Sequence, residues 1–364
     1  MNKFILLFIT LFWFGSVQAC YDENVGDSEN FTNCQKTAEQ GNAEAQFYLG
    51  WMYEYGQGVT QDYKQAFFWY SKAAEQGLAE AQYYLGGMYG NGQGVPQDYK
   101  QAFSWYSKAA EQGYSKAQYN LGWMYEYGQG VTQDYKQAFF WYSKAAEQGY
   151  SKAQYNLGWM YGNGQGVTQD YKQAFFWYSK AAEQGYYKAQ GNLGVLYYEG
   201  QGVVQDYKQA FFWFSKAADQ GFTGAQVGLG VMYHEGQGVT QDYKQAFFWY
   251  SKAAEQGDTG AQYLLGMMYF KGQGAVQDYK QAASWFSRAA EQGDAPAQYT
   301  LGMMYAKGQG VIQDYVMAHM WFNITSSNGY KDSANKRDVI ARGISAEQRS
   351  EAHKLAREWV AEHQ

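Results

Sequence analysis

Few residues in this chain are of a type and spacing that could do chemistry. Ser333 and Lys336 form an S-x-x-K motif, in which a lysine can activate a serine nucleophile, but no S-D-N or K-T-G motif accompanies it. No G-x-S-x-G, H-E-x-x-H or C-x-x-C motif occurs. No histidine has zinc-ligand spacing to a cysteine or to a second histidine; the four are His234, His319, His353 and His363. The sequence therefore predicts no catalytic residues, no metal site and no cofactor.

The chain consists largely of one sequence unit repeated in tandem, and the elements that position its side chains recur with it. The stretch VTQDYKQAFFWYSKAAEQG occurs unchanged at residues 59–77, 131–149, 167–185 and 239–257. Glycines 36 residues apart mark eight tandem units over residues 42–329; they are Gly41, Gly77, Gly113, Gly149, Gly185, Gly221, Gly257, Gly293 and Gly329. Self-similarity at a period of this size indicates a stacked array in which each unit buries its apolar face against its neighbours.

Each unit reads as a helix, a glycine turn and a second helix. In the first unit, apolar residues recur at the spacing of one helical face; they are Ala45, Leu49, Met52 and Tyr53. The run ends at residues 56–58, Gly-Gln-Gly, where glycine can adopt the left-handed backbone that closes a helix. Asp62 is expected to cap the second helix, with Gln65 as its capping-box partner. Gly77 ends that helix.

A glycine lies in the middle of every first helix. Such a glycine costs about 1 kcal/mol against alanine, so its recurrence within one chain needs a physical reason. We expect the close approach of a neighbouring ring, with the Trp69 type of residue as the occupant, and a hinge as the weaker alternative. The glycines are Gly50, Gly86, Gly122, Gly158, Gly194, Gly230, Gly266 and Gly302.

The repeat resembles the Sel-one-like repeat family, relatives of the tetratricopeptide repeats. The matching residues include the pairs Ala81-Gln82 and Leu85-Gly86, the loop at residues 92–95, and the series from Ala102 to Gly113. The resemblance covers all eight units and implies an all-α, right-handed α-α superhelical solenoid of helix-turn-helix repeats. Some cysteine-rich relatives are described as penicillin-binding or weakly β-lactamase-like. They carry a cysteine pair in each repeat, which this chain lacks, so the enzyme alternative is the weaker one.

Residues that vary between the units lie opposite the predicted core of the first helix. In related arrays this face lines a concave groove, which here would be aromatic toward the N-terminus and richer in methionine toward the C-terminus. Acidic residues flank the first six units and lysines the last two; they are Glu54, Glu126, Glu199, Glu235, Lys271 and Lys307. The predicted groove residues are Phe47, Trp51, Tyr83, Tyr119, Trp123, Tyr155, Trp159, Tyr263, Met267, Tyr299 and Met303.

An exposed row of Tyr and Trp is typical of a binding surface. We expect the groove to bind a protein or an extended peptide that is hydrophobic and somewhat basic toward its own N-terminal half. Two alternatives stay open. The rings could pack on one another as an inner core, or they could stack on glycan or peptidoglycan fragments. The sequence specifies neither the partner nor the oligomeric state.

The N-terminus reads as an export signal. Lys3 supplies a positive charge, residues 4–15 form an apolar run too short to span a bilayer, and residues 17–19 resemble a cleavage site. We therefore expect a signal peptide at 1–19 and a protein of the bacterial periplasm or the cell exterior. Cys20 and Cys34 are the only cysteines. We expect them to form a disulfide, with lipidation of Cys20 as the less favoured alternative.

The segments outside the repeats read as caps. Residues 20–41 contain a polar N-terminal capping helix, and residues 330–364 contain C-terminal capping helices in which Ser345 and Gln348 make a second capping box. The net charge of −6 with no Lys/Arg cluster disfavours a nucleic-acid partner. No further apolar run suggests an integral membrane segment after removal of the signal.

Overall fold

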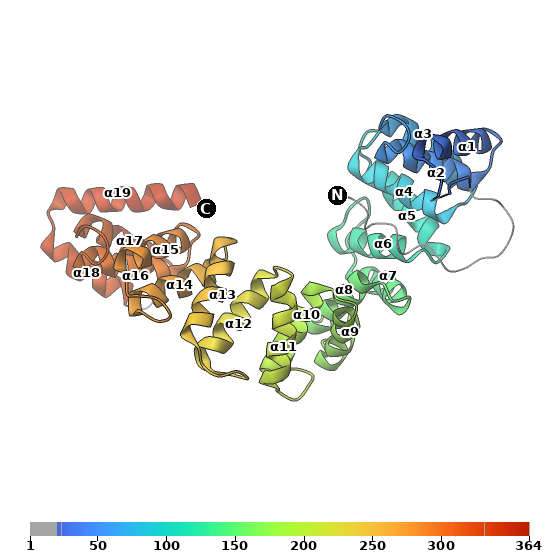
Figure 1. The fold of residues 1–364 in the computed structure, drawn as a ribbon. Coiled ribbons are helices and arrows are strands. Elements are labelled where there is room, and N and C mark those ends of the chain that lie inside the picture. The colour runs from blue at the N-terminus through green and yellow to red at the C-terminus, as the bar shows by residue number, and fades with distance from the viewer. Residues whose placement is uncertain (1–19, 23, 331, 364) are drawn as a thin grey trace. The chain divides into compact units, whose positions relative to one another are not determined.

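A computed structural model describes residues 20–22, 24–330 and 332–363. The expected signal peptide at residues 1–19 lies outside this part of the chain. All regular structure in the described residues is helical, which confirms the all-α prediction (Figure 1). The chain divides into two compact units, Met1–Gln169 and Asp170–Gln364. Within the described residues, no helix is both long enough and apolar enough to cross a bilayer.

The first unit is a stack of helices in which each one packs on the next along the chain. Two successive repeat helices form a hairpin, and the hairpins follow one another without insertions. The described helices of this unit are α1 (Asp27–Glu39), α2 (Ala43–Tyr55), α3 (Tyr63–Glu75), α4 (Ala79–Asn91), α5 (Tyr99–Glu111), α6 (Ser115–Tyr127), α7 (Tyr135–Glu147) and α8 (Ser151–Asn163).

The second unit continues the pattern and ends in two helices that both pack on α17. Its described helices are α9 (Tyr171–Glu183), α10 (Tyr187–Glu199), α11 (Tyr207–Asp219), α12 (Thr223–Glu235), α13 (Tyr243–Glu255), α14 (Thr259–Lys271), α15 (Tyr279–Glu291), α16 (Ala295–Lys307), α17 (Tyr315–Ser327), α18 (Ser333–Gly343) and α19 (Ala346–His363).

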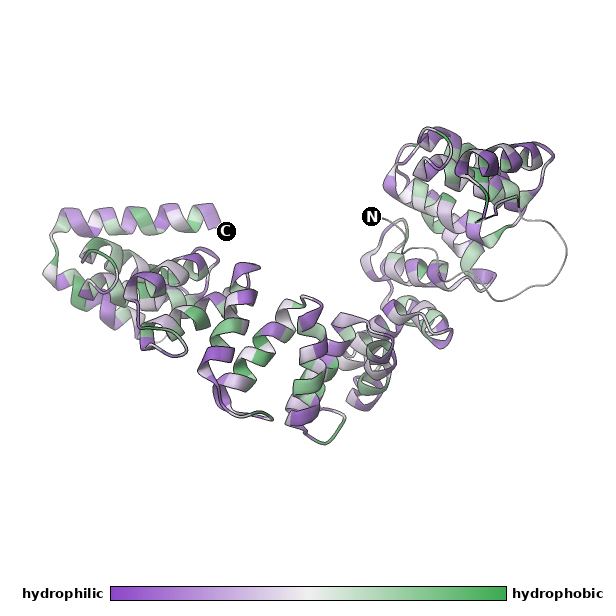
Figure 2. Ribbon diagram, viewed as in Figure 1, coloured by the Kyte–Doolittle hydropathy of each residue, from purple (hydrophilic) through white to green (hydrophobic). Residues whose placement is uncertain are grey.

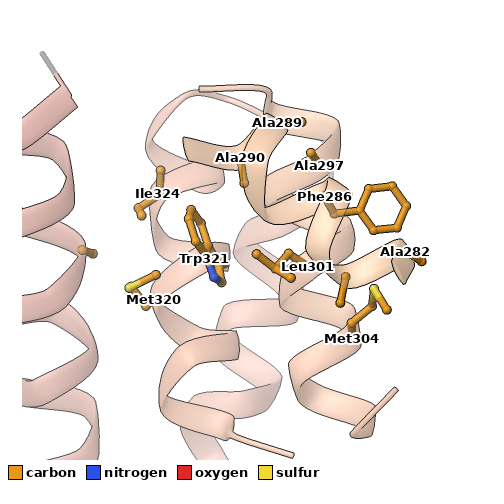
Figure 3. Close-up of a cluster of buried hydrophobic side chains, with 12 residues drawn as sticks. Ala282, Phe286, Ala289, Ala290, Ala297, Leu301, Met304, Met320, Trp321 and Ile324 are labelled. Carbon is orange, nitrogen blue, oxygen red and sulfur yellow. The ribbon is translucent and has the colours of Figure 1, made fainter. Parts of the chain in front are cut away.

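Each helix buries one face, as the apolar spacing predicts. Figure 2 shows apolar and polar residues alternating along the repeat helices. Leu49 and Met52 of α2 are fully buried, as are their equivalents in the later repeats. At the C-terminal end, Phe286, Leu301 and Trp321 belong to a cluster contributed by α15, α16 and α17, to which α19 adds Ala356 (Figure 3).

The helix ends follow the predicted caps with one exception. Gly56 closes α2 with a left-handed φ of 69°, and the Asp62 carboxylate accepts hydrogen bonds from the backbone N–H groups of residues 64 and 65. The prediction of a capping box at Gln65 is wrong, because the Asp62 N–H donates instead to the Tyr53 carbonyl of the preceding helix at 2.9 Å. The box at Ser345 and Gln348 is confirmed, since each donates its backbone N–H to the other's side chain.

The mid-helix glycines make room for a ring, but not for the tryptophan that we expected. A Cβ at Gly50 would lie 2.8 Å from Cδ1 of Tyr70, which is completely buried. The next residue along the second helix therefore fills the space. Trp69 packs on the preceding cluster, which contains Ala38 and Leu49. The close approach was predictable from the glycine, whereas the identity of the ring was not.

A ladder of glutamines connects successive repeats inside the stack. The buried Gln46 donates from Nε2 to the Ala38 carbonyl at 3.1 Å, and its Oε1 accepts from Gln76 at 2.7 Å. Equivalent pairs recur along the chain, for example Gln112 with Gln82 and Gln292 with Gln262. Because buried amides are costly to leave unpaired, this ladder stabilises one register of the stack.

The two cysteines are joined by a disulfide between Cys20 and Cys34 of α1, with their Cα atoms 4.7 Å apart. No free cysteine is present in the described part of the chain. The bond attaches the segment before α1 to the first helix of the stack.

Candidate functional site

The predicted groove residues occupy equivalent positions on the first helices, and most of them are half-buried. Trp123 is the exception, with 38% of its surface exposed. The half-buried members are Phe47, Trp51, Tyr83, Tyr119, Tyr155, Trp159, Tyr263, Met267, Tyr299 and Met303. They are therefore neither free surface nor closed core.

The rings at the Phe47 position pack on the buried ring beneath the mid-helix glycine. Tyr83 lies 5.7 Å from Tyr106 and 5.3 Å from Tyr114, measured between ring centroids. Tyr119 makes the same two contacts with Tyr142 and Tyr150. This arrangement matches the alternative in which these rings pack on one another, and the rings remain half-buried.

Two aromatic pairs project further from the first unit. Trp51 lies 5.3 Å from Tyr55, and Trp123 lies 5.2 Å from Tyr127. The tyrosines are 53% and 56% exposed. Tyr55 and Tyr127 are not among the predicted groove residues, although each lies four residues after a tryptophan and therefore on the same helix face as that tryptophan.

Two of the acidic residues predicted to flank the groove form hydrogen bonds with buried tyrosines. Glu54 Oε2 accepts a 2.7 Å hydrogen bond from the Tyr70 hydroxyl, and Glu126 accepts one of 2.6 Å from Tyr142. Burial raises the pKa of Glu54, and the hydrogen bond from Tyr70 partly opposes that shift. Glu199 and Glu235 stand one position later in their helices and are exposed, as are Lys271 and Lys307.

A pocket of about 410 Å³ opens over the second repeat of the first unit, between Glu54 of the first repeat and Trp123 of the third. The second repeat has Gly87 where its neighbours have Trp51 and Trp123, and Gly90 where they have Glu54 and Glu126. The pocket is lined by Glu54, Tyr83, Tyr84, Gly87, Met88, Gly90, Asn91, Gln93, Tyr99, Ala102, Tyr106, Asn120, Trp123 and Met124.

The pocket combines aromatic rings with hydrogen-bond acceptors and one carboxylate. Burial, with smaller contributions from neighbouring tyrosines and glutamates, raises the pKa of Tyr84 to about 12. Burial also raises the pKa of Tyr83 and Tyr106, against the opposing effect of a side-chain hydrogen bond with Asn120. Tyr83, Tyr84 and Tyr106 thus stay neutral, and Glu54 is the carboxylic acid of the lining. None of the described lining residues is Lys, Arg or His.

A second aromatic surface lies on the second helices. Its phenylalanines are 45–47% exposed, and each contacts the tryptophan that follows it; they are Phe68, Phe140, Phe176, Phe212 and Phe248. Lysine ammonium groups lie over these rings, as Lys72 does over Phe68 at 5.0 Å. Each ring thus contacts the tryptophan and the lysine of its own helix, as Phe68 does with Trp69 and Lys72.

The residues that could do covalent or metal chemistry do not form a site. His319 is buried beside His353 of α19, with 5.1 Å between ring centroids. Burial lowers the pKa of His319 to about 4. Ser333 of the S-x-x-K motif is fully buried, so a substrate cannot reach its hydroxyl. No group of three or more His, Cys, Asp or Glu residues in the described ranges could hold a metal ion.

Comparison with known proteins finds the same repeat. A family model described as Sel1 repeat matches residues 43–78, 79–114, 115–150, 151–186, 188–222, 223–258, 259–294 and 295–330. A protective antigen of uropathogenic Escherichia coli strains, described as displaying an SLR fold, is 38% identical, with 93% of this chain and 72% of that chain covered and a TM-score of 0.87. A Sel1 repeat protein from Oxalobacter formigenes is 34% identical, with coverage of 89% and 96% and a TM-score of 0.64. A comparison with curated proteins finds no match.

Proposed function

The chain belongs to the Sel1 repeat family, and on this premise we propose that it is an exported scaffold that binds an extended segment of a partner protein. Sel1 repeat proteins are generally protein-interaction scaffolds. The binding surface in this proposal is the aromatic groove of the first helices. The partner segment is hydrophobic and somewhat basic, because Glu54 and Glu126 lie beside the aromatic residues.

The observation that carries the proposal is the exposure of the two aromatic pairs in the first unit. Trp123 and Tyr127 hold their rings together with 38% and 56% of their surfaces exposed, and Tyr55 beside Trp51 is 53% exposed. Tryptophan and tyrosine provide large contact areas at low entropic cost and dominate the energetics of interfaces. We infer that these exposed rings contribute more to binding a partner than to the stability of the helical repeats.

Export has its own support. Disulfides persist in oxidising compartments, and the first helix carries the Cys20–Cys34 bond. The 38% identical relative is described as a protective antigen, a description that fits a protein accessible outside the cytoplasm. Both points agree with the apolar run that follows Lys3.

Peptide selection tests the proposal. A phage library of short unstructured peptides is panned against the mature protein, and each selected peptide is titrated against two double variants. Trp123→Ala with Tyr127→Ala removes an exposed pair of the first helices and is expected to weaken binding by about tenfold or more. Phe68→Ala with Phe140→Ala removes the same kind of surface from the second helices and is the matched control.

The proposal fails if the selected peptides bind the Trp123/Tyr127 variant at full affinity while the control variant loses them. That result would assign recognition to the second-helix phenylalanines. Circular dichroism of both variants establishes that the helical stack is intact.

A further inference from the structure

We propose that the pocket over Gly87 and Gly90 binds the guanidinium group of an arginine side chain presented by the partner. The inference rests on the proposed binding function and names the residue that anchors the partner in the first unit.

The fold does not require glycine at either position that opens the pocket. A Cβ at Gly87 would lie 3.5 Å from the Tyr106 hydroxyl, and one at Gly90 would lie 3.8 Å from the Ala102 Cβ, which are ordinary contacts. Neither glycine has a left-handed φ. At the adjacent Gly86, by contrast, a Cβ would lie 2.9 Å from two ring carbons of Tyr106. Packing therefore explains Gly86, whereas Gly87 and Gly90 leave space that larger side chains fill in the neighbouring repeats.

Glycine at position 90 also leaves the buried Tyr106 without the glutamate that Tyr70 and Tyr142 contact, although Tyr106 keeps a side-chain hydrogen bond with Asn120. Tyr70 and Tyr142 donate to Glu54 and Glu126, but Gly90 stands where the glutamate of Tyr106 would be. The Tyr106 side chain, only 8% exposed, lines the pocket. A ligand in the pocket can take the place of the absent glutamate as a neighbour of this hydroxyl.

The charge of the lining selects a cation. Glu54 lines the pocket, and because its Oε2 accepts from Tyr70, the second carboxylate oxygen is left for a ligand donor. Tyr83, Tyr84 and Trp123 add aromatic faces, which attract cations. A half-buried carboxylate with no basic residue in the lining is stabilised by a positively charged ligand.

Guanidinium fits this lining better than ammonium does. It is planar, so it can stack on the ring of Trp123, and it carries five N–H donors in fixed directions. The lining offers acceptors on the Glu54 carboxylate, the Asn120 carbonyl and the tyrosine hydroxyls, and the five donors of guanidinium can pair with more of them than the three donors of an ammonium. A pocket of about 410 Å³ holds such a group together with part of its alkyl chain.

The test titrates N-acetyl amino acid amides, whose termini carry no charge, and follows binding by NMR at the two methionines of the lining. The mature protein is labelled with ¹³C at the methionine methyl groups, and Met88 and Met124 are assigned by their substitution with leucine. N-acetyl-arginine amide is titrated against N-acetyl-citrulline amide, its neutral isostere, and N-acetyl-lysine amide. We expect saturable shifts of both methyls with the arginine probe, and affinity at least about tenfold weaker with citrulline.

Three variants show whether the probe occupies this pocket. Glu54→Gln is expected to reduce the arginine affinity to that of the citrulline probe. Gly87→Trp inserts the side chain that the flanking repeats carry and is expected to abolish binding. Val195→Trp places the same side chain at the same register of a repeat in the second unit and is expected to leave binding unchanged. Should Gly87→Trp fail to fold, Glu54→Gln still decides the outcome.

Each outcome separates this inference from the proposed function. Equal shifts from arginine and citrulline probes, or shifts caused by N-acetylglucosamine in place of arginine, would overturn the assignment of a cation. Absence of any shift from the arginine probe would also overturn it. If the peptides selected by phage display still bind the first-helix aromatic pairs in that case, the scaffold proposal stands and the arginine anchor alone is lost.

Discussion

Adjacent glycines in α4 predict opposite responses to the same substitution. Alanine in a helix interior is favoured over glycine by about 1 kcal/mol. At Gly87 the added methyl makes only an ordinary 3.5 Å contact, so Gly87→Ala should stabilise the repeat by about that amount. At Gly86 the methyl would press on Tyr106 at 2.9 Å, and overpacking costs about 1–3 kcal/mol. Gly86→Ala should therefore change the free energy of unfolding by between about zero and −2 kcal/mol.

Hydrogen exchange is the appropriate assay, because a tandem array need not unfold in one cooperative step. Protection of the amides in α4 and α5 is measured for both variants at fixed pH and temperature. The expected result is higher protection for Gly87→Ala than for the parent, and a gap of about 1–3 kcal/mol between the two variants.

Two results would refute the reasoning. If Gly86→Ala stabilises as much as Gly87→Ala, the Tyr106 ring does not press on the helix at Gly86. If Gly87→Ala destabilises the repeat, the fold itself requires that glycine, and the argument that the pocket is kept open for a ligand loses its basis.

Three further predictions concern the two ends of the stack. The buried Oε1 of Gln298 has no hydrogen-bond partner, because Asn328 stands where other repeats have the glutamine that donates to it. Asn328→Gln should therefore raise the free energy of hydrogen-exchange protection in α16 by about 1 kcal/mol. An unchanged protection would contradict the role of the glutamine ladder. Burial lowers the pKa of His319 to about 4, so on acidification the unfolded chain takes up this proton at a higher pH than the folded chain does. Stability of the C-terminal repeat should then fall by about 1.4 kcal/mol per pH unit below about 6.5, and His319→Gln should remove this dependence in urea titrations at pH 7 and pH 5. Cys34→Ser should lower protection of α1 by up to about 3 kcal/mol and leave α6 unchanged.

The helix boundaries were predictable because local chemistry sets them. An aspartate N-cap begins the second helix of each repeat and a left-handed glycine ends the first helix, whereas several first helices, such as α4, begin without a side-chain cap. The helix α19 begins directly after the capping Ser345. The capping box shows the limit of this reasoning. Ser345 and Gln348 pair as predicted, but at Asp62 a carbonyl from the preceding helix takes the N–H. A tertiary contact replaced a local one, and no local pattern could show it.

The contacts between repeats were less predictable than the helices. The Gly-Gln-Gly motif of the loop predicts a turn, but its second glycine also contacts the second helix of the preceding repeat. At Gly94 a Cβ would overlap the Tyr63 carbonyl of α3. Likewise the ring beneath Gly50 is Tyr70 and not Trp69, because a shift of one residue turns a side chain by about 100° round the helix. Such assignments depend on how two helices are rotated against each other.

The open pocket can be distinguished from an ordinary gap by comparison with another repeat. At Gly191 a ring is also missing from the aromatic row, but Phe222 moves its own ring into that space, and a Cβ there would overlap Cε1 of Phe222. At Gly87 no side chain does this: Tyr114 packs on Tyr83, and the space remains. Gly191 stands at the Phe47 position and Gly87 at the Trp51 position, so a neighbouring ring fills the gap in one row while the gap in the other row remains. A gap left open beside the half-buried Glu54 carboxylate is the arrangement expected of a site that a ligand fills.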